Sequence, residues 1–469
     1  MKRAILLIWT LLILLPPAVS QDYYKVLKHS RISTGLNEAA AIPYEDGGVV
    51  YITESTSVGA SSPTDTEGRR LFTIFYLGNN GQKRFFREEL VSQKHEGPVS
   101  FSGDYNTMVF CQQRPQAGSR VDPLGLYFAD RNEAGHWVNE RAFEFNRPDA
   151  WLFSPSLSED GRTLYFAANF EDGLGGFDIY RSKLRGGVWS KPENLGPEVN
   201  THRNELYPFI HPLGKLYFSS EGRDGDKAGY DMFMTAFVSG EWFEAIRLGT
   251  PINSLSDEYQ LWFSDDFKEG YLTSNRRSRS KEIFEISTDI PEFESPEPIK
   301  KTFYKYMLRD KKLKMDTVDT NLFSYYWVIN DTLELPGHEV IYKFPKPGSY
   351  DCKLMVYDIQ LDTLVVQNTM LLPIKLIEQA VIICPDTIVA GTPVEFDGTQ
   401  TYLPDFDDNA YLWDFGDGSY GQGKQVIHTY LYPGRFRVTL GVQERKKNRK
   451  DVPKMRSNFK DVIVVQSGQ

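Results

Sequence analysis

The chain has 469 residues, of which 41% are hydrophobic and 14% aromatic, and its formal net charge is −10 at pH 7. This length exceeds that of one ordinary domain and leaves room for a large core. No stripe of lysine and arginine offsets the negative charge on a recognisable module, so nucleic acid is excluded as an expected partner.

Residues 1–20 have the order of a secretory signal peptide. Lys2 and Arg3 come first, an apolar stretch follows, and small residues end the segment before Gln21. We therefore expect an exported mature chain that starts at Gln21. No cysteine follows the apolar stretch to carry a lipid anchor, and no later segment has the length and apolarity of a membrane span. The sequence thus predicts no transmembrane segment or lipid anchor of its own.

Residues 21–294 carry a repeat. Phe166 recurs as Phe218 and Trp189 recurs as Trp242, at offsets of 52 and 53 residues, together with a Leu-Tyr-Phe strand and a glycine-aromatic-aspartate strand. A period of this length with several short strands in each unit indicates the blades of a β-propeller.

Extending the repeat in both directions predicts five blades, with six as the alternative. The last unit lacks an outer strand, and the leftover segment Tyr23–Leu27 is expected to supply it. Pairing the two ends of the array would close the ring and remove its exposed edges.

A second repeat, with a period of 86 residues, covers the rest of the chain. Trp327 matches Trp413, and in both copies a Pro-Gly turn precedes a strand with strict apolar and polar alternation. This pattern predicts two immunoglobulin-like β-sandwich domains, at 295–377 and 378–469, after a linker at Ser295–Pro298. The predicted fold class is therefore all-β, a propeller followed by two sandwiches.

Three cysteines give no disulfide framework in an exported chain of this length. Cys111 and Cys352 lie in strand-like segments, and Cys384 opens the last domain. Isolated buried thiols are the favoured interpretation, and a link between Cys352 and Cys384 stays open.

The second sandwich resembles a polycystic-kidney-disease (PKD) domain. The resemblance lies in Trp-Asp-Phe-Gly-Asp-Gly at 413–418, His-Thr-Tyr at 428–430 and Pro-Gly at 433–434. The first copy keeps Trp327 and the Pro-Gly pair at 347–348 but lacks the Asp/Gly turn. It resembles a degenerate member of the same family.

The blade motif is similar to the WD-like propeller repeats of Tol-B-type and outer-membrane-protein-A-associated proteins, well over 150–290 and poorly over 37–149. The two resemblances imply a protein of the Gram-negative envelope, in the periplasm, at the outer membrane or at the cell surface. Some proteins of this build are linked to type IX secretion and gliding, so an accessory role in an outer-membrane secretion or motility complex is expected.

From these observations we expect a non-enzymatic scaffold that binds one or more envelope protein partners. The alternative is a glycan-binding or glycan-cleaving propeller with sandwich spacer domains. The sequence contains no motif of a metalloprotease, a serine hydrolase or a phosphate-binding loop.

Glu205 and Glu258 are the candidate binding residues at the propeller axis. They occupy equivalent places at the start of innermost strands, and paired carboxylates are what glycoside hydrolysis requires. The equivalent place in the preceding blade is Leu152, which breaks the acidic ring. We therefore favour a structural role, in which these glutamates cap strands, over catalysis.

Asp405, Asp407 and Asp408 are the candidate metal ligands, because carboxylates at short spacing can hold calcium. Calcium is the weaker alternative to a plain acidic loop, and the sequence indicates no other cofactor.

Overall fold

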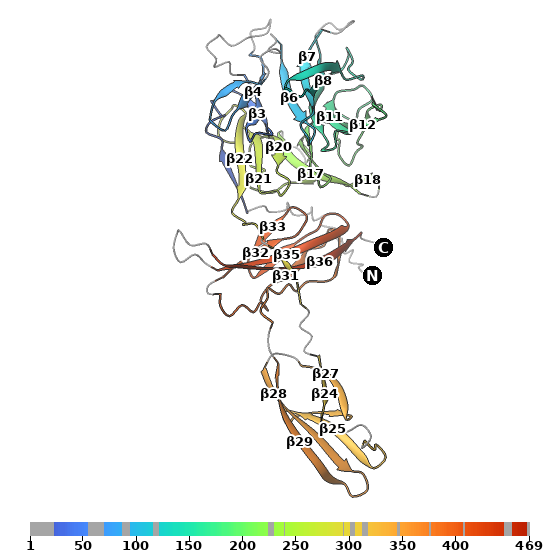
Figure 1. Ribbon diagram of the computed structural model, residues 1–469. Helices are drawn as coiled ribbons and strands as arrows, with labels where there is room; N and C mark the ends of the chain where they lie inside the picture. The colour runs from blue at the N-terminus through green and yellow to red at the C-terminus, as the bar shows by residue number, and fades with distance from the viewer. Residues whose placement is uncertain are drawn as a thin grey trace, which may run out of the picture.

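The structure is a computed structural model of the chain. It describes residues 23–54, 70–86, 94–115, 122–223, 229–238, 240–293, 295–300, 305–311, 318–344, 348–374, 377–406, 409–444 and 453–466. Figure 1 shows three bodies, with the N-terminal sheets at one end, the C-terminal domain in red at the centre and the middle domain in orange at the far end. Within the described ranges, no helix has the length and apolarity needed to cross a bilayer.

Five antiparallel sheets follow one another in the described part of residues 23–293. The first is β2 (Glu38–Pro43), β3 (Val49–Thr53), β4 (Thr73–Leu77) and β5 (Lys83–Phe85). The second is β6 (Glu96–Phe101), β7 (Thr107–Gln113), β8 (Leu124–Arg131) and β9 (Trp137–Ala142). The third is β10 (Leu152–Leu157), β11 (Thr163–Ala168) and β12 (Asp178–Arg185), with β13 (Val188–Trp189) and β14 (Glu193–Asn194) on β12.

The fourth sheet is β15 (Glu205–Ile210), β16 (Lys215–Glu221) and β17 (Tyr230–Val238), with β18 (Glu241–Trp242) and β19 (Ile246–Arg247) on β17. The fifth is β20 (Glu258–Phe263), β21 (Glu269–Ser274), β22 (Glu282–Thr288) and β1 (Tyr24–Lys28). This arrangement is consistent with a β-propeller, and the all-β fold class is confirmed.

The N-terminal strand completes the fifth sheet, as the sequence predicts. β1 pairs antiparallel with β22, from Tyr24 opposite Thr288 to Lys28 opposite Phe284. The Tyr24 hydroxyl donates to the carbonyl oxygen of Phe267 at 2.8 Å. The two ends of the N-terminal region are therefore held in one sheet, which protects an edge that would otherwise be open.

The recurring tryptophans pack between neighbouring sheets, as their spacing suggests. The Trp189 ring stacks on Phe128 of the preceding sheet with ring centroids 5.3 Å apart. Trp242 meets Tyr165 of its preceding sheet edge-on at 6.1 Å. Trp189 is buried and Trp242 is partly buried where adjacent sheets face each other.

The C-terminal domain is a sandwich of two sheets around Trp413. One sheet has the order β23 (Glu297–Pro298), β36 (Met455–Val465), β35 (Gly434–Glu444), β32 (Asn409–Asp414) and β33 (Tyr420–Gln422), with β30 (Thr387–Val389) also on β36. The facing sheet is β31 (Val394–Asp397) and β34 (Gln425–His428). Trp413 is fully buried against Phe396 and Phe415, and its indole N–H donates to the carbonyl oxygen of Gly423 at 2.8 Å.

The middle domain is also built around a buried tryptophan. Its sheet has the order β26 (Leu333–Pro336), β25 (Phe323–Ile329), β28 (Gly348–Asp358) and β29 (Thr363–Ile374), and β24 (Lys305–Arg309) pairs with β27 (Glu339–Lys343). The buried Trp327 donates its indole N–H to the carbonyl oxygen of His338 at 3.0 Å.

Cys111, Cys352 and Cys384 are all free, so the alternative of a Cys352–Cys384 link is wrong.

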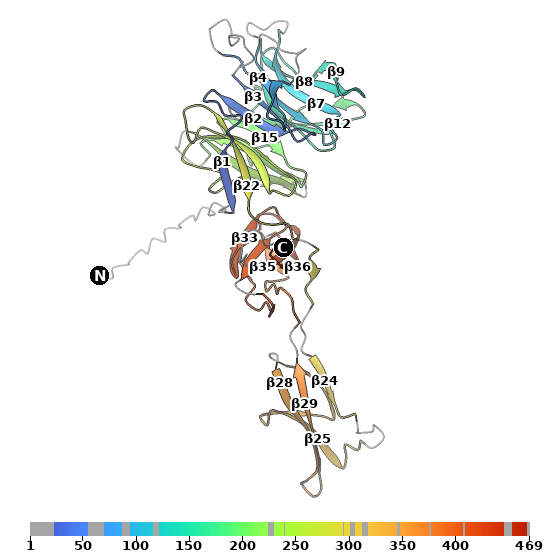
Figure 2. The ribbon, with the colours of Figure 1, turned by 60° about the vertical axis from the view of Figure 1, so that its left-hand side comes forward.

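One expectation about the domain boundaries needs correction. The expected linker contains β23, whose Glu297 pairs in parallel with Asn458 of β36, so it is a strand of the C-terminal domain. Phe293, just before it, lies over Gly441 of the same domain. The chain thus enters the C-terminal domain, leaves it to form the middle domain, and returns. Figures 1 and 2 both show the C-terminal domain between the N-terminal sheets and the middle domain.

Candidate functional site

Glu258 is the centre of a buried hydrogen-bond network at the start of β20. Its carboxylate is fully buried and accepts hydrogen bonds from the backbone N–H and hydroxyl of Ser254, at 3.1 and 2.6 Å. The Ser274 hydroxyl donates at 2.9 Å and the Arg276 guanidinium at 3.0 Å. Burial raises the pKa of Glu258, and the bonds from Ser254 and the charge of Arg276 oppose that rise.

Glu205 repeats this network at the start of β15. Thr201 donates from its backbone N–H and its hydroxyl, both at 2.8 Å, and the Ser220 hydroxyl donates at 2.6 Å. Arg223 takes the place of Arg276 and donates to the carbonyl oxygen of Val199 at 2.6 Å. The glutamates therefore fix the loop before each innermost strand, which is the structural role favoured from the sequence.

Two further glutamates of this kind were not predicted from the sequence. Glu38 and Glu96 begin β2 and β6 and are buried, so Leu152 of β10 is the exception among the five described innermost strands. The first two sheets repeat the blade motif weakly, and therefore no sequence signal aligned these residues. Neither Glu205 nor Glu258 is among the residues that line the cavity at the axis.

The cavity at the axis has a volume of 330 Å³. All five innermost strands contribute to its wall, together with the turns that follow them. The aromatic lining residues are Phe101, Tyr105, Tyr207, Phe209, Trp262 and Phe263, and the carboxylates are Glu159 and Asp265.

The calcium candidates are not brought together. Asp405 is exposed in the loop before β32, and Asp407 and Asp408 lie outside the described residues. In the described part of the chain, no group of three or more histidine, cysteine, aspartate or glutamate side chains could hold a metal ion.

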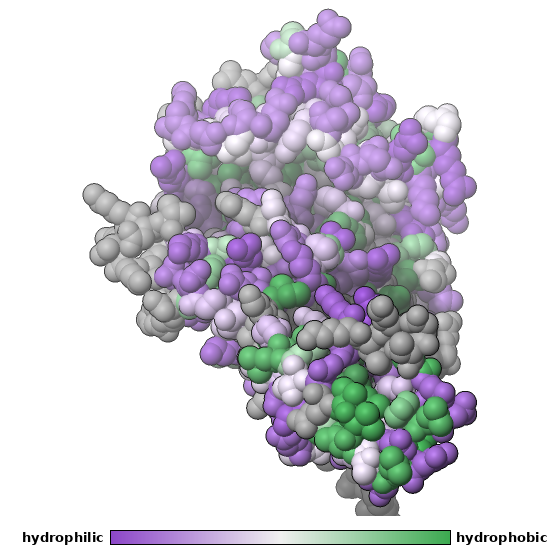
Figure 3. Space-filling view, turned by 60° about the horizontal axis from the view of Figure 1, so that its bottom comes forward, coloured by the Kyte–Doolittle hydropathy of each residue, from purple (hydrophilic) through white to green (hydrophobic). Residues whose placement is uncertain are grey.

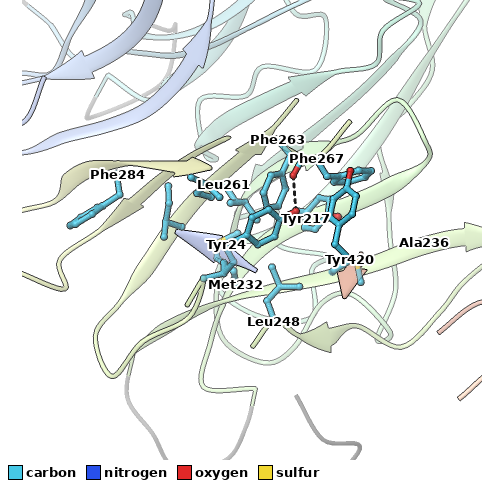
Figure 4. Close-up of a cluster of buried hydrophobic side chains, with 14 of the residues drawn as sticks. Tyr24, Tyr217, Met232, Ala236, Leu248, Leu261, Phe263, Phe267, Phe284 and Tyr420 are labelled. Atoms are coloured by element: carbon cyan, nitrogen blue, oxygen red, sulfur yellow. Dashed lines mark hydrogen bonds between the residues drawn. The ribbon is translucent and has the colours of Figure 1, made fainter. Parts of the chain in front are cut away.

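The C-terminal domain docks on the fourth and fifth sheets of the N-terminal region. Tyr420 enters their buried cluster beside Tyr217 and Phe267 (Figure 4). Its hydroxyl donates to the carbonyl oxygen of Asp266 at 2.6 Å. Gly418 lies so close to the Phe267 ring that a Cβ atom there would be 2.5 Å from it. The contact therefore depends on the Asp/Gly turn that identifies the domain.

Charged groups surround this turn. The Lys215 ammonium donates to the carbonyl oxygen of Asp417, and His428 lies 3.0 Å from the Asp417 carboxylate. Burial alone would raise the pKa of Asp417, but His428 and Lys215 hold it well below its usual range. Burial raises the pKa of Asp414 to about 6, against the opposing hydrogen bond from the Gly416 N–H.

We expect Asp414→Asn to stabilise the protein at neutral pH. The raised pKa of Asp414 means that the folded state prefers the neutral carboxyl. The neutral form therefore stabilises the folded state near pH 4, and this stability is lost as the pH rises through about 6. An amide keeps an oxygen for the Gly416 N–H and carries no charge. The free energy of unfolding should rise by about 1 to 2 kcal/mol above pH 6 and stay the same near pH 4.

Urea unfolding across this pH range measures the effect of Asp414→Asn. Asp417→Asn is the matched variant of opposite sign, because the lowered pKa of Asp417 gives stability that is present at neutral pH and lost in acid. Equal destabilisation by both variants at neutral pH would contradict this account of the turn.

An apolar surface lies at the far end of the middle domain, at the β28–β29 hairpin and beside it. Six of its side chains are between 41% and 70% exposed, and we call them the tip patch: Leu322, Ile359, Leu361, Leu364, Val365 and Val366. Figure 3 shows apolar side chains gathered on the end of the molecule that the middle domain forms. β29 is the edge of its sheet, with β28 as its one neighbour among the described strands.

Comparison with known proteins identifies one domain. The PKD domain matches residues 378–455, so a PKD domain near the C-terminus is confirmed. Collagenase ColA of Clostridium perfringens (strain 13 / Type A) is 25% identical over 136 residues, which are 29% of this chain and 12% of that protein. The chain thus spans a small part of that relative.

Two solved arabinan-degrading enzymes are similar in structure. The endo-arabinase from Bacteroides thetaiotaomicron VPI-5482 has a TM-score of 0.34 at 11% identity, covering 57% of this chain and 98% of its own. The arabinanase Arb43A of Bacillus subtilis has a TM-score of 0.34 at 10% identity, covering 55% of this chain and 95% of its own.

Proposed function

We propose that this chain is an exported, non-enzymatic scaffold that binds a protein partner in a Gram-negative envelope, as an accessory part of an outer-membrane secretion or motility complex. In this proposal the N-terminal region is a five-bladed propeller, and the middle domain is a degenerate PKD-like sandwich. The tip patch is the observation that carries the proposal.

The tip patch is unlike the scattered apolar residues of an ordinary surface. It gathers six leucine, isoleucine and valine side chains on one hairpin and the residue beside it. Exposed apolar patches above a few hundred Å² are uncommon on monomeric proteins and mark interaction sites. Covering such a patch with a protein partner contributes about 25 cal/mol for each Å² of apolar surface removed from water.

The arrangement of the domains gives a partner access to the tip patch. The C-terminal domain is anchored to the N-terminal sheets through Tyr420 and Lys215, and the middle domain extends from its opposite side (Figures 1 and 2). The tip patch is therefore the point of the middle domain farthest from the propeller-like body. A scaffold needs such a separation between its anchored body and the surface that it offers.

The envelope location rests on the signal-peptide pattern of residues 1–20, which lie outside the described residues, and on the resemblance of the repeats. The lining of the axial cavity supports a non-enzymatic role. Its two carboxylates, Glu159 and Asp265, are exposed in turns, whereas the buried Glu205 and Glu258 are engaged by their own chain.

Copurification from intact envelopes tests the proposal. We expect the double variant Leu361→Asp and Leu364→Asp to reduce the recovered partner by about tenfold, because losing two apolar contacts of the interface should cost at least about 1.4 kcal/mol of binding, which is tenfold in affinity. The melting temperature should stay unchanged, since both side chains are exposed. Leu213→Asp, at an exposed site of the N-terminal region, is the matched control and should leave recovery intact. Full recovery with the tip variant would contradict the proposal.

A further inference from the structure

The axial cavity is a second candidate site, and it is independent of the tip patch. Each innermost strand is the edge of its sheet, so the backbone groups on its outer side face the axis. The wall therefore combines exposed backbone groups with the side chains of five strands. What this wall offers a ligand depends on which of those groups remain free.

Prolines remove backbone donors from the wall. Pro98, Pro155 and Pro208 lie on β6, β10 and β15 and all line the cavity. Each is within the register shift of its strand, where ladder pairing is interrupted. Proline has no N–H to direct at the axis, and it adds an apolar ring.

Hydroxyl groups engage other donors of the wall. The backbone N–H of Tyr207 donates to the Ser154 hydroxyl at 3.0 Å, and that of Ile210 donates to the Ser156 hydroxyl at 3.0 Å. Both bonds join the neighbouring innermost strands β15 and β10. At these five positions the wall therefore offers a ligand no free backbone donor.

The charged groups of the lining are all acidic. Glu159 and Asp265 are its two carboxylates, and the lining contains no lysine, arginine or histidine. Trp262 and Tyr105 add aromatic faces, which attract cations. Burial raises the pKa of Tyr105, and the nearby carboxylates of Glu45 and Asp265 raise it further.

We propose that this cavity binds a primary ammonium group carried on a short apolar chain. The acidic turns at Glu159 and Asp265 hold the ammonium, and the prolines and aromatic rings enclose the chain. The volume of 330 Å³ is at the lower end of the range of about 300 to 1,000 Å³ that is usual for ligand pockets. A sugar fits this wall less well, because its hydroxyls need donors and acceptors in similar number.

The backbone supports a preformed site. Ala40, Ser154 and Tyr207 line the cavity and have φ values of 53°, 47° and 50°, in the left-handed region that residues other than glycine rarely adopt. Strained conformations of this kind persist where the surroundings fix them, and they gather at ligand sites. The cavity should therefore bind its ligand with little rearrangement.

Isothermal titration calorimetry of the full chain tests the proposal, with hexylammonium as the probe and hexanoate and 1-hexanol as isosteric controls. Hexylammonium should bind at least about tenfold more tightly than either control. Raising the salt concentration about tenfold should lower its affinity. Glu159→Gln with Asp265→Asn should weaken hexylammonium binding by about tenfold, or about threefold for each charge, and leave 1-hexanol unaffected.

Glu133→Gln, at an exposed turn of the second sheet, is the matched control and should change nothing. Two peptides distinguish the natural source of the ammonium: acetyl-Leu-Lys amide presents a lysine side chain, and Leu-Leu amide presents an amino terminus. The tighter of the two identifies that source, and binding of hexylammonium alone identifies a free amine.

Three results would overturn the proposal. They are the absence of hexylammonium binding, binding of hexanoate or 1-hexanol as tightly as hexylammonium, and full retention of hexylammonium binding by the double carboxylate variant.

Discussion

Trp413→Ala should unfold the C-terminal domain and free the middle domain from the N-terminal sheets. The side chain is completely buried, and truncating such a residue costs about 3 to 5 kcal/mol of the roughly 5 to 15 kcal/mol that holds a domain together. The docking residue Tyr420 and the strand β23 belong to this domain, so both connections fail with it. Limited proteolysis should cleave the C-terminal domain and leave the N-terminal region and the middle domain as separate protected fragments.

Trp327→Ala is the matched variant of Trp413→Ala. It empties the separate core of the middle domain, so that domain alone should lose protection. The C-terminal domain should stay docked, because the buried cluster at its contact with the N-terminal sheets includes none of the described residues of the middle domain. Loss of both domains in the Trp327 variant would show that they fold as one unit.

Deleting residues 23–28 should open the N-terminal ring. The deletion removes all of β1, its pairing with β22 and the buried Tyr24 side chain. It also removes Tyr23, whose ring meets Tyr420 edge-on at 5.6 Å, so the docking of the C-terminal domain should weaken as well. Calorimetry should show a lower melting temperature for the N-terminal region and an unchanged transition for the middle domain.

Tyr24→Phe is a milder change than the deletion of β1. It keeps β1 and removes only the hydrogen bond to Phe267, which should cost about 1 kcal/mol. Lys25→Ala, at an exposed pair with Asp289, should have little effect. A deletion variant that melts at the parent temperature would mean that β1 does not close the ring.

Period and strand pattern predicted the parts of the structure that repeat. Trp189 and Trp242 recur with the blade period because each fills the same space between sheets, and Trp327 and Trp413 recur because each centres one sandwich. The outer strand at Tyr24 was predictable because the last unit lacked one. These positions recur for one reason: each repeat unit leaves the same space in the core, and the same type of side chain fills it.

The arrangement of the domains was not predictable from the same patterns. β23 has two residues, and its parallel pairing of Glu297 with Asn458 joins positions far apart in the chain. Two residues carry no periodicity, and their Pro-rich surroundings are typical of a linker. Turn chemistry alone is enough to account for an Asp/Gly turn, so the pattern gave no sign that Asp417 and Gly418 also contact Lys215 and Phe267.

The candidate sites also divide into those that repeat in the sequence, which were predictable, and those that do not. Glu205 and Glu258 stood out because they repeat, and their repeat reflects a shared structural network. The axial cavity was missed because prolines and aromatic residues such as Pro155 and Trp262 are typical of packing as well as of binding. The tip patch was missed because a run of apolar residues such as Leu364, Val365 and Val366 on β29 is as typical of a core strand as of an exposed one, and exposure becomes visible only in the assembled sheet.

Site-specific photo-crosslinking in intact envelopes tests the central claim most directly. A photoreactive amino acid at Leu361 should give a single covalent adduct with an envelope protein, because this account places the partner on the tip patch. The same group at Leu174, a site on the N-terminal region that is 50% exposed, should give none. An adduct at Leu174 with none at Leu361 would contradict the claim that the middle domain presents the docking surface.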